Sequence, residues 1–280
     1  MKRKIFYFLV LCFMVASCSN GGPAKKEVEP DTVSDSILVA EEEDTLDLFD
    51  EVEVPKSADE LFNDFFYSFT SDESFQMSRI RFPLVCNDGD EKLKISRSDW
   101  KNFNRFTNLD YYSALYEREI EMGLQKDTSL SHVSVEWIYL HDAYIEKYNF
   151  QRVKGVWILM DIEKSDFNHN PNGGFLRFYA DFVSDSISYE KSLAHPLKLL
   201  ISNEDDDTKY EEETLSESGW KDFKKDMPLP NEFLININYG QSYFSQNRKI
   251  LLIEGVSNSL FVKYTFDRSN GQWRLFRIEI

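Results

Sequence analysis

Large apolar side chains recur along this chain first at helical spacing and then at strand spacing, and the whole order is repeated. Residues 62–69 carry phenylalanine at positions i, i+3, i+4 and i+7, one face of an amphipathic helix, and residues 175–182 repeat this aromatic stripe at an offset of 113. The segments 133–140 and 250–254 are rich in β-branched and aromatic residues, as strands are. Each unit therefore predicts helices followed by a sheet, which is an α+β order.

Further motifs show the same duplication. Ser-x-Ser-x-Trp-Lys-x-Phe begins at Ser96 and again at Ser216, and a longer pattern over residues 147–163 returns over residues 263–279 at an offset of 116. A unit of about 110 residues is a common domain size. The predicted divisions are repeat 1 at residues 58–163, a linker at 164–174 and repeat 2 at 175–280.

Local signals mark the ends of several predicted elements. Asp72 and Asp185 follow the two helical stripes and are placed to cap a second helix, because a side-chain oxygen there can accept free backbone N–H groups. Asn270-Gly271 predicts a two-residue type I′ turn, since both turn positions need positive φ. This turn places Arg268 opposite Trp273, Phe266 opposite Leu275, and Tyr264 opposite Arg277. The equivalent register in the first repeat places Arg152 opposite Trp157 and Phe150 opposite Leu159. Arginines stacked on tryptophans have a structural explanation that needs no substrate.

The helical stripe, the Pro-Leu pair after the helices and the Trp-x-Leu closing strand resemble the nuclear-transport-factor-2-like (NTF2-like) fold. The resemblance implies two tandem NTF2-like cone domains, each with N-terminal helices packed on a bent antiparallel sheet. With Phe-Pro-Leu at 82–84, Val-Glu-Trp-Ile at 135–138 and Asn-Ile-Asn-Tyr-Gly-Gln at 236–241, the chain from residue 58 is similar to a family of Bacteroidetes lipoproteins known only as a domain of unknown function. Related proteins bind small molecules or partner proteins inside the cone, and the resemblance implies no catalytic residue.

The segment 1–18 has the pattern of a bacterial lipoprotein signal. Basic residues precede an apolar run, Ile5 to Val15, that is too short to span a bilayer, and Val15-Ala16-Ser17-Cys18 resembles a lipobox. A lipidated Cys18 would anchor the chain to a membrane without spanning it; a cleaved signal with an incidental cysteine is the alternative. Residues 19–26 lack the acidic export signal of related lipoproteins, which favours a periplasm-facing position in the cell envelope over the cell surface.

Charge and cysteine content narrow the picture. The formal net charge is −17, which argues against a nucleic-acid partner, since phosphates would repel the chain. Twelve acidic residues and no Lys or Arg lie within residues 27–53, so we interpret 19–57 as a disordered acidic tether; a docking site for a basic partner is the alternative. Cys86 remains alone after processing, which leaves no partner for an intramolecular disulfide.

Motifs for known chemistry are missing from the sequence. It contains no nucleophile elbow, no metal-binding His or Cys pair and no phosphate-binding loop, so we expect no catalytic residue, no metal and no cofactor. The acidic run at 204–207 lacks the alternating spacing of a calcium loop and is better explained as a solvated loop. Candidates for the lining of a pocket in the cones are Tyr148, Arg152, Tyr264, Arg268 and His195.

Two classes of function remain after this search, beside a purely structural role in the envelope. The first is a non-catalytic module, anchored through Cys18, that binds a small-molecule ligand or an envelope protein. The alternative is a small-molecule isomerase, dehydratase or hydrolase of the NTF2-like type that uses Tyr148, Asp161, Tyr264 or His195. An enzyme would need a titratable side chain with a partner in an open cavity, whereas a cone filled by aromatic rings would leave the binding or interaction hypothesis standing.

Overall fold

The computed structural model describes residues 59–101, 106, 109–203, 206–227, 229–245, 247–256 and 258–280. The predicted signal peptide, Cys18 and the acidic tether lie outside these residues, and so do Phe103, Glu204 and Asp205. The described residues belong to one compact unit. None of the helices in the described ranges is long and apolar enough to cross a membrane.

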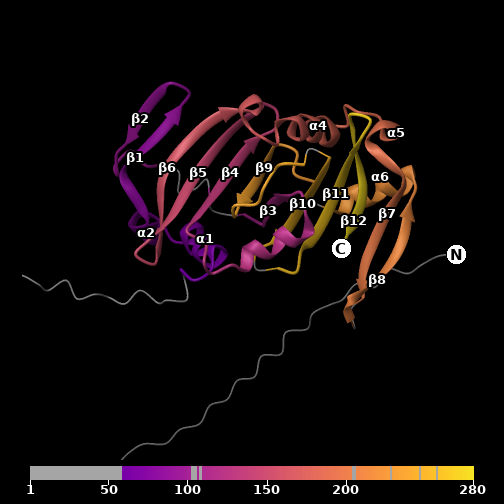
Figure 1. Ribbon diagram of the computed structural model, residues 1–280, viewed down its shortest axis with the longest axis horizontal. Coiled ribbons are helices and arrows are strands. Elements are labelled where there is room, and N and C mark those ends of the chain that lie inside the picture. Colours follow the sequence, from indigo (N-terminus) through magenta and orange to yellow (C-terminus); the bar gives the residue numbers. More distant parts are fainter. Residues whose placement is uncertain are drawn as a thin grey trace, which may run out of the picture. The chain divides into compact units, whose positions relative to one another are not determined.

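Each half of the described chain runs from short helices into strands, as the hydrophobic pattern predicts (Figure 1). The first half contains α1 (Phe62–Ser71), α2 (Glu73–Ser78), β1 (Ile80–Asp88), β2 (Glu91–Ile95), β3 (Tyr111–Tyr116), the 3-10 helix η1 (Glu119–Lys126), β4 (His132–Tyr139), β5 (Tyr144–Val153) and β6 (Val156–Asp166). The second contains the 3-10 helix η2 (Phe167–His169), α4 (Gly173–Val183), α5 (Tyr189–Ser192), β7 (Leu193–Asn203), β8 (Asp206–Leu215), α6 (Glu217–Asp226), β9 (Phe233–Asn238), β10 (Arg248–Gly255), β11 (Phe261–Ser269) and β12 (Gln272–Glu279). The α+β class is confirmed.

The strands form two six-stranded sheets with the same internal order. Sheet 1 is ordered β2-β1-β6-β5-β4-β9, and sheet 2, read from its other edge, is ordered β8-β7-β12-β11-β10-β3. One pair in each sheet is parallel, β1 with β6 and β7 with β12. The other pairs are antiparallel. The sheets are therefore mixed, which the sequence pattern of closing hairpins did not reveal.

The last strand of each sheet comes from the other half of the chain. β9 pairs with β4, where Asn236 lies opposite Glu136, and β3 pairs with β10, where Ala114 lies opposite Leu252. Figure 1 shows orange β9 beside pink β4. The halves thus exchange their third strands, an arrangement related to domain swapping but within one chain. The linker predicted at 164–174 separates two units of sequence, but it does not separate the two sheets.

Two aromatic cores hold the helices to the sheets, and both halves contribute to each. In core 1 the stripe of residues 62–69 packs against Phe150 and Trp157, and the second half adds apolar side chains of β9 and β10. In core 2 the stripe of residues 175–182 packs against Phe266 and Trp273, and the first half adds Leu115 and Ile138. Removing either half would expose apolar surface in both cores.

The closing hairpins have the predicted turn and most of the predicted register. Asn270 and Gly271 have φ of 52° and 80°, as a type I′ turn requires, and Lys154 and Gly155 form the equivalent turn with φ of 51° and 89°. The confirmed cross-strand pairs are Arg268 with Trp273, Phe266 with Leu275, Arg152 with Trp157, and Phe150 with Leu159. The pair Tyr264 with Arg277 is wrong: an irregularity between Thr265 and Phe266 places Tyr264 opposite Ile278.

The two predicted helix caps have different outcomes. The Asp72 side chain accepts a hydrogen bond from the backbone N–H of Phe75 at 2.9 Å and caps α2, as expected. Asp185 does not directly precede a helix, because α5 begins only at Tyr189. Asp185 instead has a φ of 55° and pairs with Lys224 of α6.

Candidate binding cleft on sheet 1

The inner face of sheet 1, where an NTF2-like cone would hold a ligand, is packed with aromatic rings. The ring centroids of Phe62 and Trp157 lie 5.1 Å apart, and those of Phe69 and Phe150 lie 5.3 Å apart, both edge to face. The equivalent rings in core 2, Phe175 and Trp273, are 5.3 Å apart. The helical stripes therefore fill the cones, and the large hollows among the described residues lie elsewhere.

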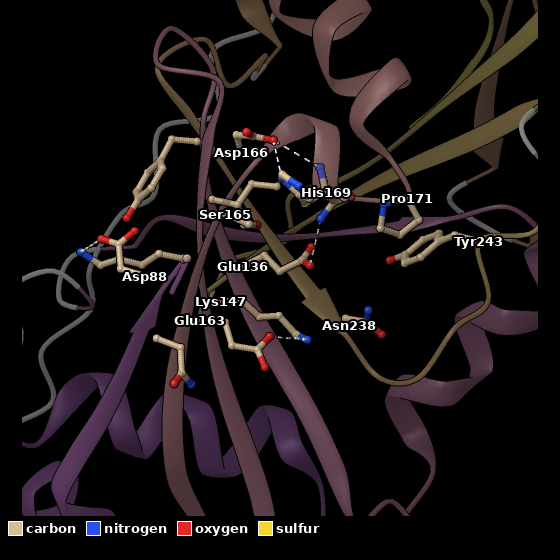
Figure 2. A pocket seen from close by; sticks show the side chains of 16 residues that line it. Asp88, Glu136, Lys147, Glu163, Ser165, Asp166, His169, Pro171, Asn238 and Tyr243 are labelled. Atoms are coloured by element: carbon tan, nitrogen blue, oxygen red, sulfur yellow. Dashed lines mark hydrogen bonds and ion pairs between the residues drawn. The ribbon is translucent and has the colours of Figure 1, made fainter. Parts of the chain in front are cut away.

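A polar cleft of about 860 Å³ lies on the opposite face of sheet 1. It is lined by side chains of β1, β4, β5, β6 and β9, and by the segment that follows η2 (Figure 2). A shallower hollow of about 470 Å³ shares Lys147, Glu163 and Asn238 with it and continues along β5. Strand alternation accounts for this face: Val135 and Trp137 of β4 point into core 1, so Glu136 between them points away from it.

Glu136 is a buried carboxyl group in the wall of the polar cleft. It is 5% exposed and accepts hydrogen bonds from the Asn236 side-chain amide at 2.6 Å and from the Asn170 amide at 3.4 Å. Burial raises the pKa of Glu136, and these amide hydrogen bonds only partly oppose the effect. Lys147 lies opposite on β5, but its ammonium group pairs with Glu163 at 3.2 Å. Among the described residues, no cation forms an ion pair with Glu136.

The strand exchange positions this carboxyl group. Asn236 belongs to β9 of the second half, and its side-chain oxygen accepts the backbone N–H of Leu115 on β3 at 2.8 Å. Its amide nitrogen donates to Glu136 of the first half. The Tyr243 hydroxyl, at the edge of the cleft, donates to the carbonyl of Leu115 at 3.1 Å. The crossing strands therefore hold Glu136 through a network that neither half contains alone.

The rim of the cleft carries ion pairs that are open to solvent. Lys164 lies 3.8 Å from the Asp88 carboxylate and 3.7 Å from that of Glu146. His169 bonds Asp166 through Nδ1 at 3.0 Å, and Figure 2 shows this pair beside the segment that contains Pro171. The lining contains four carboxyl groups, at Asp88, Glu136, Glu163 and Asp166, and two lysines, at 147 and 164. The polar cleft therefore has an acidic surplus.

The structure does not gather the residues expected from sequence into one pocket. Tyr148 is buried in core 1 and donates its hydroxyl to Glu146 at 3.1 Å, whereas Tyr264 is buried in core 2, where burial raises its pKa. His195 is exposed on β7. Asp161 accepts the Asn149 amide at 2.7 Å in the shallow hollow.

The two stacked arginines lie in different halves and have different surroundings. The Arg152 guanidinium carbon lies 4.9 Å from the Trp157 ring centroid, and the group donates to the backbone carbonyl of Thr128 at 2.5 Å. The Arg268 guanidinium carbon lies 5.9 Å from the Trp273 ring centroid. Arg268 also lines a separate hollow at the start of α4.

Sequence reasoning missed the central residues of the polar cleft, although their signals were present. Glu136 is the carboxyl group in the otherwise apolar run Val135 to Ile138, and Asn236 has the same character in β9. Both belong to the short motifs that carry the family resemblance. Because their strands are one hundred positions apart, only the pairing of β4 with β9 reveals that the two motifs meet.

Comparisons with known proteins agree with this architecture. The model of a family described as a domain of unknown function (DUF4348) matches residues 41–280. The chain belongs to this family. It is also similar to the crystal structure of an NTF2-like protein from Bacteroides fragilis, with 38% sequence identity and a TM-score of 0.73, covering 79% of this chain and 96% of that one. The expected NTF2-like fold is therefore confirmed. No curated protein matches the chain.

Proposed function

We propose that the mature chain is a membrane-anchored, periplasm-facing module of the cell envelope that binds a polar ligand in the cleft without transforming it. The anchor is assigned to Cys18 at the end of the signal-like segment. Support for binding comes from the cleft, whose volume of about 860 Å³ is typical of small-molecule sites. The packed cones support a site on the outer face of the sheet.

The observation that carries the proposal is the Glu136 carboxyl group, which is buried in the cleft wall and forms no ion pair with any described residue; the nearby Lys147 is paired with Glu163. A buried carboxylate is stabilised by a charged hydrogen-bond donor more than by neutral amides. The acidic surplus of the lining acts in the same direction. We therefore expect a small polar ligand that carries a protonated amino group, with the Tyr144 and Tyr243 rings at the edges of the same cleft.

Calorimetric titration of the mature chain with a lysine tripeptide tests this function, using the peptide acetylated at its amino groups as the matched probe. We expect saturable binding of the amine form that Glu136→Gln weakens about tenfold, the effect of losing one charge-assisted hydrogen bond. Glu212→Gln, an exposed carboxylate on β8, should change nothing. Equal affinity for the two peptides, or binding indifferent to Glu136→Gln, would contradict the proposal.

The anchor is tested separately. Cys18→Ala should abolish acyl labelling and release the protein from membranes, since the lipid supplies the membrane affinity. Acyl labelling that persists in the variant would show that the lipid is attached elsewhere.

A second candidate, a small-molecule isomerase, dehydratase or hydrolase, is favoured by one observation. A carboxyl group with a raised pKa in an open cleft can serve as a general acid or base, and Glu136 fits that description. NMR of a bound ligand over time separates the two functions. An unchanged ligand supports a binding module, whereas conversion that Glu136→Gln abolishes supports the enzyme.

A further inference from the structure

A second hollow lies at the start of α4 and shares Asn170 and Pro171 with the polar cleft. Its volume is about 250 Å³, and we call it the arginine hollow. Its lining includes Asn168, Gly174, Arg177, Lys249, Arg268 and Trp273. None of the described residues that line it carries a carboxyl group.

Three cationic side chains line the arginine hollow, and among the described residues one of them, Lys249, has an acidic partner. Lys249 is 2% exposed, and its ammonium group binds the Glu117 carboxylate and the Asn172 side-chain oxygen, each at 2.6 Å. Arg177 donates to the amide oxygen of Asn168, and Arg268 Nε donates to the carbonyl of Gly271 at 3.3 Å. Within the described ranges, neither guanidinium group forms an ion pair. Two arginines without carboxylate partners are unexpected in a chain with a net charge of −17.

The equivalent place in the first half is arranged differently. Arg152, the equivalent of Arg268, uses its guanidinium group on the backbone carbonyls of Thr128, Asp59 and Glu60. The offset of 113 between the helical stripes aligns Leu61 with Gly174, so the second half lacks a side chain here. The same offset aligns Asp64 with Arg177, so a carboxylate is replaced by a guanidinium group. Both changes make the second site more open and more positive.

We infer that the arginine hollow binds an oxyanion, a phosphate or a carboxylate group, on Arg177 and Arg268. A guanidinium group offers parallel N–H donors that match two oxygens of such a group. Lys249 lies in the same hollow, but its charge is compensated by the Glu117 carboxylate, so the two arginines provide the attraction. The first turn of the 11-residue helix α4 contributes in the same direction. A hollow of about 250 Å³ has room for one such group and a small substituent. This site is separate from the polar cleft and does not depend on the function proposed for it.

Calorimetric titration of the mature chain with inorganic phosphate and with acetate, at constant chloride concentration, tests the inference. We expect saturable binding of at least one probe, weakened about tenfold by Arg177→Gln and by Arg268→Gln. Gly174→Leu should abolish it by restoring the side chain of the first half. A Cβ atom at Gly174 meets no neighbouring atom within 4 Å, and its φ is not positive, so this variant should fold. Arg177 is exposed, so its variant should fold as well.

Arg152→Gln is the matched control, because it removes the equivalent stacked arginine of the first half and should leave the affinity for the probe unchanged. Binding of phosphate alone would indicate a phosphorylated ligand, and binding of acetate alone would indicate a carboxylate ligand; both support the site. No saturable binding of either probe overturns the inference. So does binding that survives Arg177→Gln, Arg268→Gln and Gly174→Leu.

Discussion

Lys147–Glu163 on sheet 1 and Lys263–Glu279 on sheet 2 are the same ion pair at an offset of 116, yet their surroundings differ. The side chains of Lys147 and Glu163 are 35% and 49% exposed, and their N···O distance is 3.2 Å. Those of Lys263 and Glu279 are 10% and 6% exposed, and their N···O distance is 2.5 Å. One duplicated sheet face thus remains an open cleft, while the other is covered.

The connection between the third and fourth strands explains the difference. In the first half it spans residues 117–131 and contains η1, and because β3 pairs with β10 it lies over sheet 2. There Glu119 binds Arg277 at 2.5 Å and lies 3.8 Å from Lys263. The corresponding connection of the second half spans only residues 239–247 and lies beside the polar cleft, to which it contributes Tyr243. Loop length, combined with strand exchange, therefore decides which copy keeps an open face.

The largest effect is expected from separating the halves. A chain of residues 59–166 would lack β9 and one of residues 167–280 would lack β3, so each would lose an edge strand and part of both cores. We expect neither fragment to show cooperative thermal unfolding by circular dichroism, and the two mixed together to recover it. A monomeric fragment that unfolds cooperatively would show that the exchange is dispensable.

Truncating the equivalent tryptophans should affect both halves alike. Trp157 is fully buried and Trp273 is 7% exposed, and both pack against the aromatic stripes. Each Trp→Ala change should lower the free energy of unfolding by about 3 to 5 kcal/mol in urea denaturation. A clearly smaller loss for Trp273→Ala would mean that core 2 is less tightly packed than core 1.

Breaking the two equivalent ion pairs should lower the free energy of unfolding by different amounts. Lys263→Met leaves the buried Glu279 carboxylate with less compensation and should cost about 3 kcal/mol. Lys147→Met breaks a solvent-screened pair and should cost less than about 1 kcal/mol. Urea denaturation of both variants measures the difference. Equal losses would contradict the view that η1 covers one copy and leaves the other open.

The smallest effect is expected at Glu136. Glu136 lies opposite Lys147, and Leu252 lies opposite Lys263, the equivalent of Lys147, so Leu252 takes the place of Glu136 in the second half. Burial raises its pKa, so the folded state holds the proton more tightly and the free energy of unfolding falls as the pH rises from the unfolded pKa through the folded one. Glu136→Gln removes the ionisable group and with it this pH-dependent loss of stability. The glutamine side chain keeps an oxygen that can accept the hydrogen bond from Asn236. Its stability relative to wild type should rise in thermal scans as the pH increases above the pKa of an unfolded glutamate, about 4.3. A rise of the same size in Glu163→Gln would assign the effect to general surface charge.

Three features followed from sequence because each depends on neighbours within a few positions. They are the aromatic stripes, the type I′ turn at Asn270-Gly271 and the register of Arg268 with Trp273. The two-fold repeat and the α+β order were likewise readable, since duplication preserves periodicity. The bulge beside Thr265 was not, and it displaced the predicted partner of Tyr264. A bulge adds a residue to one strand without a marker in the hydrophobic pattern.

The sequence by itself determined the elements, the aromatic cores and the copy number, since periodicity and turn chemistry are local properties of the chain. Only the tertiary structure decided that β3 and β9 change places, because the two repeats offer equivalent sheet edges and their sequences do not show which edge each strand joins. That exchange brings Asn236 to Glu136 and lays η1 over sheet 2. The polar cleft follows from it, through contacts between residues far apart in the chain.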